Sequence, residues 1–345
     1  MSSKEPPVIL VRADAGPSIG SGHVMRCLAL AKAWQRAGGQ VSWLMAESIP
    51  VLEERLRREG VSCSRLQVVP GSMSDGLQTI EEAQRQDAAW VVIDGYRFGP
   101  GYVRNLKAGG LRVLFVDDDG GFDSYPADLV LNQNVCATPA MYAHCETSSK
   151  LLLGSAYVLL RPEFITQRPR SVHVTKARKV LITMGGSDPE NITEKVMRAL
   201  TTTDVDLKVV IGGGNLKSDE LIDLAGISSK IEIEQSPDNM VPLMQWADIA
   251  ISAAGSTCWE LAYMGVPAIV IPCSIDQRSI AQGLAELGIA VSLGWHANLS
   301  EEAIRDAASG MLPDQAGRAR MSERGRKLID GRGAARVVEF LQNSL

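Results

Sequence analysis

The sequence predicts an α/β protein built from two doubly wound domains that face each other across a cleft. The chain has 345 residues, which is more than one ordinary domain core accounts for. Short apolar, β-rich runs alternate with helical patterns along its whole length, which is typical of parallel sheets joined by crossover helices. The basic, proline-containing segment 161–176 separates two similar halves and is predicted to be a linker.

The apolar runs predict six strands in each half. In the first domain, expected over 1–160, the strands are 8–12, 40–45, 65–69, 90–94, 112–116 and 128–132. In the second domain, expected over 177–345, they are 179–184, 207–211, 230–234, 248–252, 268–271 and 290–293. The last helical pattern, 317–345, is expected to pack back on the first domain. Open α/β sheets bind ligands beyond the carboxyl ends of their strands, so the cleft is the expected site.

Composition excludes several classes of protein. A net charge of −5, without any block of Lys and Arg, gives no electrostatic case for nucleic acid binding. The six cysteines form no C-x-x-C pair, so we expect small buried thiols in a reducing cytoplasm and neither a zinc site nor a disulfide framework. The start of the chain does not read as a signal peptide, and no run approaches the ~20 apolar residues of a membrane span. A cytoplasmic protein without membrane insertion is expected.

The segment Gly20-Ser21-Gly22-His23 is the most informative motif. It lies between the first expected strand and a helical pattern, which places His23 at a helix N-terminus. Unpaired N–H groups and the positive end of the helix dipole attract phosphate there and disfavour imidazolium. A neutral histidine beside a phosphate ester is a candidate general base, although a lone histidine is more often a cap or a loop filler.

Three small-residue turns follow expected strands of the second half: Gly185–Asp188, Gly212–Gly214 and Ala254–Thr257. Small residues let backbone amides approach a ligand, and the third turn leads into a helix, so a pyrophosphate is the expected guest. None of them is a Walker loop or a G-x-G-x-x-G fingerprint, and each alone is more often an ordinary turn. Glu260 follows in the same helix and either accepts hydrogen bonds from ribose hydroxyls or favours the helix dipole.

Blocks over nearly the whole chain resemble one family, the UDP-sugar hydrolases of pseudaminic acid biosynthesis, which cleave UDP-2,4-diacetamido-2,4,6-trideoxy-β-L-altropyranose. The matching blocks are Arg12–Asp14, Ile19–Leu28, Val92–Tyr96, Asn132–Asn134, Leu159–Phe164, Gly185–Asn191 and Ala254–Thr257. The second half also resembles the glycosyltransferase that adds N-acetylglucosamine to the lipid-linked peptidoglycan precursor, through Met240, Trp246–Asp248, Gly255, Glu260 and Gly265–Ala268. Both relatives imply the GT-B fold of two Rossmann-like domains.

The resemblance implies a role for each matched position. His23 resembles the base that deprotonates a water, which attacks the anomeric carbon opposite the leaving UDP with inversion. Ser256 and Thr257 resemble the diphosphate cradle, Glu260 the ribose ligand, and the backbone around Met240 the site that reads uracil. Tyr96 resembles a sugar-side residue, although an aromatic side chain packed under a loop fits its position equally well. The other substrate-binding positions implied are Arg12, Asp14, Gly20, Ser21, Gly22, Arg26, Gly186, Ser187, Gly255 and Gln277.

Two positions depart from the family pattern. Asp276-Gln277 stands where the family usually has Asn-Gln, so an amide that can donate is replaced at a catalytic position by Asp276. Gly95 stands where the family usually has a histidine. The first change leaves the exact sugar open, and the second leaves part of the sugar-side geometry open.

The function expected is hydrolysis of a UDP-linked 2,4-diacetamido-2,4,6-trideoxyhexose, with water as acceptor and without a metal or cofactor. Asp117, Asp118 and Asp119 permit a magnesium site, but a solvated turn with capping roles is the favoured interpretation. One alternative is a GT-B glycosyltransferase in which His23 activates an acceptor hydroxyl. Another is a non-catalytic nucleotide-sugar binding protein, which retention of His23 disfavours.

Overall fold

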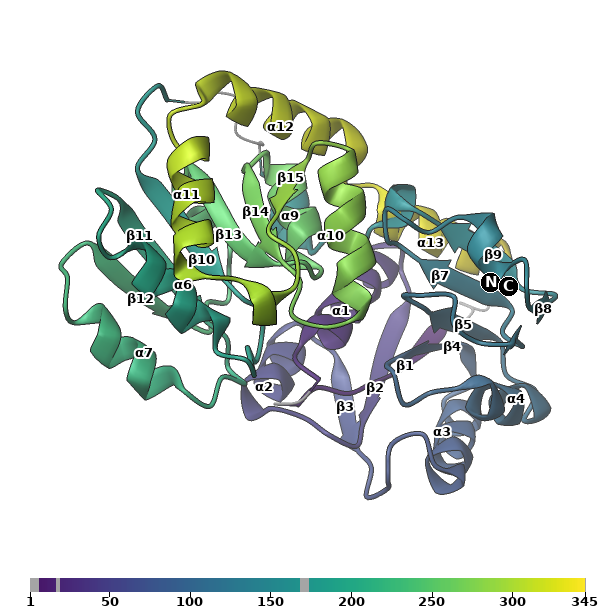
Figure 1. Cartoon of the computed structure of the whole chain (residues 1–345). Helices are drawn as coiled ribbons and strands as arrows, with labels where there is room; N and C mark the ends of the chain where they lie inside the picture. The colour runs from purple at the N-terminus through teal and green to yellow at the C-terminus, as the bar shows by residue number, and fades with distance from the viewer. Residues whose placement is uncertain (1–5, 17–18, 168–173, 345) are drawn as a thin grey trace. The chain divides into compact units, whose positions relative to one another are not determined.

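The computed structural model describes residues 6–16, 19–167 and 174–344, and the chain divides into two compact units (Figure 1). Unit 1 comprises Met1–Gly16, His23–Pro162 and Arg332–Leu345. Unit 2 comprises Pro17–Gly22 and Glu163–Gly331. Of the expected linker, Pro162–Ile165 form the short helix α5, and 168–173 lie outside the described residues.

Unit 1 is a seven-stranded parallel sheet in the order β3-β2-β1-β4-β5-β7-β9. Its strands are β1 Val8–Ala13, β2 Gln40–Met45, β3 Ser62–Arg65, β4 Ala88–Asp94, β5 Val113–Val116, β7 Leu129–Asn132 and β9 Lys150–Leu153. Its helices are α1 Gly22–Arg36, α2 Pro50–Arg58, α3 Met73–Arg85, α4 Pro100–Ala108 and α13 Gly333–Asn343. Short elements complete the unit: β6 Ser124–Tyr125, β8 Glu146–Thr147, η1 Pro139–Tyr142 and η2 Ser155–Tyr157. Apolar residues of α1, α2 and α13 cover one face of the sheet, and those of α3 and α4 cover the other.

One strand prediction in unit 1 is wrong, and one strand was missed. The third strand was expected over 65–69, whereas β3 is Ser62–Arg65 and pairs with β2. β3 is an edge strand whose four residues are all exposed, so it lacks the apolar pattern by which a buried strand is predicted. The opposite edge strand, β9 Lys150–Leu153, was not predicted at all.

Unit 2 is a six-stranded parallel sheet in the order β12-β11-β10-β13-β14-β15. Its strands are β10 Lys179–Thr183, β11 Asp206–Ile211, β12 Ile231–Gln235, β13 Ile249–Ala253, β14 Ala268–Ile271 and β15 Ala290–Ser292. Its helices include α6 Ile192–Leu200, α7 Ser218–Ala225, α8 Val241–Trp246, α9 Thr257–Met264, α10 Asp276–Glu286, α11 Glu301–Met311 and α12 Gln315–Leu328, with the turn η3 His296–Asn298. The predicted α/β class with two doubly wound parallel sheets is confirmed.

The last helical pattern of the sequence is divided between the units. α12 packs on α9 in unit 2, whereas α13 contributes Ala334, Val337, Val338 and Leu341 to the core of unit 1. The indole N–H of Trp90, on β4, donates to the carbonyl oxygen of Leu341 over 3.1 Å. The C-terminal helix therefore covers part of one face of a sheet whose strands lie far earlier in the sequence.

Two further observations concern composition. Cys27 and Cys258 are buried, whereas Cys136, Cys145 and Cys273 are partly exposed and Cys63, on the edge strand β3, is exposed. The expectation of buried thiols is therefore wrong for four of the six cysteines. Among the helices that the structure describes, none is both long and apolar enough to cross a membrane.

Candidate functional site

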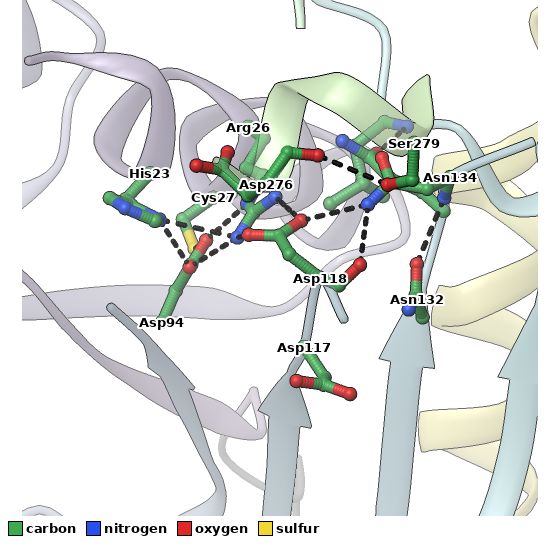
Figure 2. A network of polar contacts seen from close by, with 12 residues as sticks. His23, Arg26, Cys27, Asp94, Asp117, Asp118, Asn132, Asn134, Asp276 and Ser279 are labelled. Carbon is green, nitrogen blue, oxygen red and sulfur yellow. Dashed lines mark hydrogen bonds and ion pairs between the residues drawn. The ribbon is translucent and has the colours of Figure 1, made fainter. Parts of the chain in front are cut away.

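The carboxyl edge of the unit 1 sheet gathers a cluster of buried polar side chains (Figure 2). Strand order explains the cluster: β4 lies beside β1, and β5 lies beside β4, so residues distant in sequence meet at one edge. β4 ends at Asp94, Asp118 follows β5, and α1 begins at Gly22 and carries His23 and Arg26 on its first turns. We call His23, Arg26, Asp94 and Asp118 the buried charge cluster.

His23 is held by the carboxylate of Asp94. The imidazole Nδ1 lies 2.7 Å from Oδ1 of Asp94, and the two side chains are 7% and 0% exposed. A proton on Nδ1 makes this contact a hydrogen bond, whereas a bare Nδ1 would place two lone pairs against each other, so we assign the Nδ1–H tautomer. The lone pair of Nε2, on the other side of the ring, is then free to accept a proton.

Arg26 holds two carboxylates with one guanidinium. Its Nε and Nη2 donate to Asp94 over 2.6 and 2.7 Å, and its Nη1 and Nη2 donate to Asp118 over 2.7 and 2.9 Å. Four of the five guanidinium N–H groups are thereby used in two forked pairs, the geometry for which arginine is suited. The 3.2 Å approach of Nη2 to Nδ1 of His23 joins two donors, so it adds no hydrogen bond. The sequence-based assignment of Arg26 to substrate is therefore replaced by an internal role.

The ionisation of both carboxylates follows from these contacts. Burial by itself disfavours the charge on Asp94, but the charge of Arg26, with the contribution of His23, holds the pKa of Asp94 well below its usual range. Burial likewise opposes the charge of Asp118, and Arg26 again prevails and lowers the pKa of Asp118. The thiol of Cys27 donates to Oδ2 of Asp94 over 3.2 Å, and burial raises the pKa of that thiol. Two carboxylates against one guanidinium give these three side chains a net charge of one negative unit beside the ring of His23.

Tyr96 packs against the ring of His23. The two rings are 4.7 Å apart between centroids and meet edge to face at 82°. The side chain is 59% exposed, so the alternative of an aromatic residue packed under a loop is wrong. The neighbouring Gly95 has φ of +145°, and a Cβ atom there would lie 3.1 Å from the ring of Phe98.

The three adjacent aspartates after β5 point to different surroundings. Asp117 accepts from the hydroxyls of Tyr125 and Tyr142 over 2.9 and 2.7 Å, while Asp118 pairs with Arg26. Burial raises the pKa of Asp117 despite these hydrogen bonds. Asp119 is exposed and accepts from the backbone of Gly121. The expected solvation is wrong for Asp117, which is buried, and for Asp118, whose side chain is only 11% exposed. The expected capping role is present at Asp117, which accepts from the N–H of Gly120 over 2.9 Å.

Arg12 and Asp14 form a second internal network, so their expected contact with substrate is not supported. Arg12 is fully buried, and its Nε and Nη2 donate to Asp75 over 2.9 and 2.8 Å. Its Nη1 donates to Asp14, which also accepts from the backbone N–H of Ala46 and Glu47. These two residues join the end of β1 to α3 and to the segment after β2.

In unit 2, residues 19–22 run beside the turns that follow β10 and β13. The residues that approach each other are Gly20 with Ser187, Ser21 with Gly186, and Gly22 with Ser256. A Cβ atom added to Gly186 would lie 2.5 Å from Oγ of Ser21, so this approach requires glycine. Six of the expected substrate-binding residues are therefore neighbours within one unit.

The remaining expected residues surround the start of α9 and α10. Glu260 lies in the first turn of α9 and is 9% exposed, and Gly255 precedes that helix. The side chain of Gln277 accepts from the N–H of Cys273 over 2.9 Å, and its amide nitrogen lies near Gly255. Thr257 is the first residue of α9, Met240 precedes α8, and Asp276 is the first residue of α10. Small side chains and helix N-termini thus gather at the carboxyl edge of the unit 2 sheet, the arrangement suited to an anion.

Sequence reasoning missed three residues of these networks. Asp94 is the last residue of the expected strand 90–94, and an acidic residue at the carboxyl end of an apolar strand was a usable signal. Asp118 belongs to a run of three aspartates, a pattern that fits a magnesium site or a solvated turn and does not indicate a buried ion pair. Asp75 lies in the first turn of α3 and gave no signal. Within the described part of the chain, no group of three or more His, Cys, Asp or Glu residues is arranged to hold a metal ion.

The chain is similar in sequence to one known domain family and to several known proteins. Residues 180–330, within unit 2, match the model of the Glycosyltransferase family 28 C-terminal domain. The uncharacterized protein MJ1062 of Methanocaldococcus jannaschii is 26% identical over 273 residues, and the match spans 76% of this chain and 55% of that protein. The chain thus spans about half the length of this relative.

Two relatives with named activities match over most of their length. The UDP-2,4-diacetamido-2,4,6-trideoxy-beta-L-altropyranose hydrolase of Campylobacter jejuni is 25% identical over 82% of this chain and 98% of its own. The UDP-N-acetylglucosamine–N-acetylmuramyl-(pentapeptide) pyrophosphoryl-undecaprenol N-acetylglucosamine transferase of Mannheimia succiniciproducens is 24% identical over 85% of this chain and 88% of its own.

Among solved structures, MurG of Acinetobacter baumannii superimposes with a TM-score of 0.64 at 20% identity, covering 98% of this chain and 99% of that one. The likeness shows the fold: an α/β protein with the two parallel-sheet domains of the GT-B class. The second half of the chain, by its family match, is similar to the C-terminal domains of enzymes that act on nucleotide sugars.

Proposed function

We propose that the protein hydrolyses the anomeric C–O bond of a UDP-linked 2,4-diacetamido-2,4,6-trideoxyhexose, releasing UDP and the free sugar with inversion, for the synthesis of a pseudaminic-type acid. The observation that carries the proposal is the His23–Asp94 pair, whose 2.7 Å contact leaves Nε2 as a proton acceptor at the carboxyl edge of a sheet. The near full-length match to the Campylobacter jejuni hydrolase supports this choice of substrate.

The proposed reaction assigns one proton transfer to His23. Nε2 takes a proton from water as the water oxygen bonds to the anomeric carbon, and the bond from that carbon to the diphosphate oxygen breaks. The electron pair leaves with UDP, whose charge the backbone amides and hydroxyls of Ser256 and Thr257 would stabilise. The imidazolium formed is stabilised by Asp94, which stays ionised. Tyr96 would line the sugar, and Asp276 would contact an acetamido or hydroxyl group.

The nucleotide would be held by unit 2. Residues 20–22, Gly186, Ser187 and Gly255 offer close backbone approach, Glu260 would accept from the ribose hydroxyls, and the backbone at Met240 would read the base. No step of the proposed mechanism requires a metal. Turnover is therefore expected to be unchanged by a strong chelator, which an assay with and without EDTA measures.

The decisive assay uses purified protein and UDP-2,4-diacetamido-2,4,6-trideoxy-β-L-altropyranose in ¹⁸O-water without any acceptor. We expect one UDP per free sugar, an anomeric proton signal of the inverted product, and the heavy oxygen on the sugar. Heavy oxygen on UDP would instead show cleavage of the P–O bond and would refute the mechanism.

A glycosyltransferase is the second candidate. The family 28 match and the Mannheimia succiniciproducens relative favour it, and His23 would then activate an acceptor hydroxyl. Bound UDP-sugar that turns over only when a lipid-linked or free sugar acceptor is added would support the transferase and exclude the hydrolase.

A further inference from the structure

We propose that Asp118 is a positioning residue that fixes the catalytic His23 through Arg26 and Asp94. Asp118 lies outside the expected catalytic set, and hydrogen bonds link its side chain to His23 by way of Arg26 and Asp94. Figure 2 shows the hydrogen bonds that connect the four side chains at the carboxyl ends of neighbouring strands. The proposal deepens the proposed function and depends on it only where turnover is measured.

Asp118 is itself held in place from a third strand. The amide Nδ2 of Asn134 donates to the backbone oxygen of Asp118 over 3.0 Å and to its Oδ1 over 3.2 Å. Asn134 is 2% exposed, and its own N–H donates to Oδ1 of Asn132 at the end of β7. A continuous series of hydrogen bonds therefore runs from β7 through the segment after β5 to α1 and β4.

The fork between Asp118 and Arg26 removes the freedom that a long side chain would otherwise have. If Arg26 were bound only to Asp94, its guanidinium could tilt about that one carboxylate, because its Nη1 edge would not be held. Pairing of Nη1 and Nη2 with Asp118 anchors the far edge of the guanidinium. The near edge then presents Nε and Nη2 to Asp94 in one orientation, which in turn selects the Nδ1–H tautomer of His23.

A direct role of Asp118 on substrate fits the structure less well. Both carboxylate oxygens are engaged by Arg26, and the side chain is 11% exposed. Asp118 also supplies the second negative charge of the cluster. That charge lies on the side of Arg26 away from Asp94, where it neutralises the guanidinium. The negative charge of Asp94 is then available to stabilise a positive charge on His23.

The test compares Asp118→Asn with Asp119→Asn, a matched control that removes the same charge from the next, exposed residue. Protein labelled with ¹⁵N at its four histidines reports the tautomer of His23 by NMR, in the absence of any substrate. We expect Asp118→Asn to lose the uniform Nδ1–H state and to lower kcat by about 10- to 100-fold with KM nearly unchanged. Asp119→Asn should leave both quantities as in the wild type.

Several outcomes would overturn the proposal. An unchanged His23 tautomer in Asp118→Asn excludes positioning whether or not turnover falls, and a raised KM with unchanged kcat assigns Asp118 to the substrate. If Asp118→Asn does not fold, Asn134→Ser tests the same series, because it removes the donor to Asp118 without burying a new charge; a wild-type tautomer there overturns the proposal. Failure of the wild-type protein to hydrolyse the sugar refutes the proposed function alone, since the tautomer measurement needs no turnover.

Discussion

At the scale of single residues, the site is defined by what is buried and how it is paired. An ionised Asp94 with no exposed surface persists because a guanidinium and an imidazole both donate to it. Unpaired, the same carboxylate would be protonated or expelled from the core. The cluster therefore orients His23 and keeps a negative charge where an imidazolium would form.

Replacement of the proposed base gives the first prediction. His23→Asn should bind UDP as the wild type does but lose turnover by about 10²- to 10⁴-fold, because proton transfer by a positioned base contributes that much. Calorimetric titration with UDP and the turnover assay measure the two properties. His144→Asn, at an exposed position, is the control and should leave both intact. Normal turnover in His23→Asn would exclude it as the base.

Stability should depend on pH through Asp94. Its pKa in the folded protein is held below the value of about 3.9 for an unfolded chain, so it adds stability above that value and loses it as pH falls. Asp94→Asn should therefore be destabilised most at pH 7, and the difference from the wild type should shrink below about pH 5. Urea unfolding at several pH values measures this. A difference that stays constant with pH would contradict the assignment.

At the scale of secondary-structure elements, both sheets place their candidate site residues at the carboxyl ends of the strands. In unit 2 this edge consists of tight turns, and two of them touch. The N–H of Gly214 donates to the carbonyl oxygen of Gly186 over 2.9 Å, which ties the turn after β11 to the turn after β10. The glycines of the turn after β11 therefore restrict the conformation of the turn after β10. This holds whichever of the two turns contacts a ligand.

The contact between the turns gives a prediction on nucleotide binding. A Cβ atom at Gly212 would lie 2.4 Å from the carbonyl oxygen of Gly186 and 2.5 Å from that of Gly185, so Gly212→Ala must displace the first turn. We expect the affinity for UDP to fall about tenfold, equivalent to about 1.4 kcal/mol. Gly310→Ala is the control, since nothing lies within 4 Å of that Cβ position in α11. Equal affinities in both variants would show that the turn does not bind the nucleotide.

At the scale of the whole chain, unit 1 is assembled from three segments that two segments of unit 2 separate. Its last helix, α13, fills the face of the unit 1 sheet next to α1, although the intervening 163–331 form the other unit. The packing includes the amino group of Lys150 placed 4.0 Å from the centre of the Phe340 ring. Folding of the unit that carries His23 therefore depends on residues at the far end of the sequence.

This dependence predicts a selective loss of stability. Leu341 is fully buried in unit 1, so Leu341→Ala should cost about 2–5 kcal/mol, whereas Gln342→Ala at the exposed neighbour should cost little. Limited proteolysis with mass-spectrometric mapping should show faster cleavage within 23–162 and unchanged cleavage within 163–331. Faster cleavage in both regions would mean that the units do not unfold separately.

The class of fold, the parallel sheets, the position of His23 at the start of α1 and the small-residue turns could all be predicted from the amino-acid sequence. These features depend on patterns among neighbouring residues, which local periodicity and turn chemistry reveal. The three-dimensional packing was needed to show that Asp94, Arg26 and Asp118 surround His23, that Arg12 pairs with Asp75, and that α13 belongs to unit 1. Strand order and long-range packing bring those residues together, and no local pattern encodes which distant segments meet.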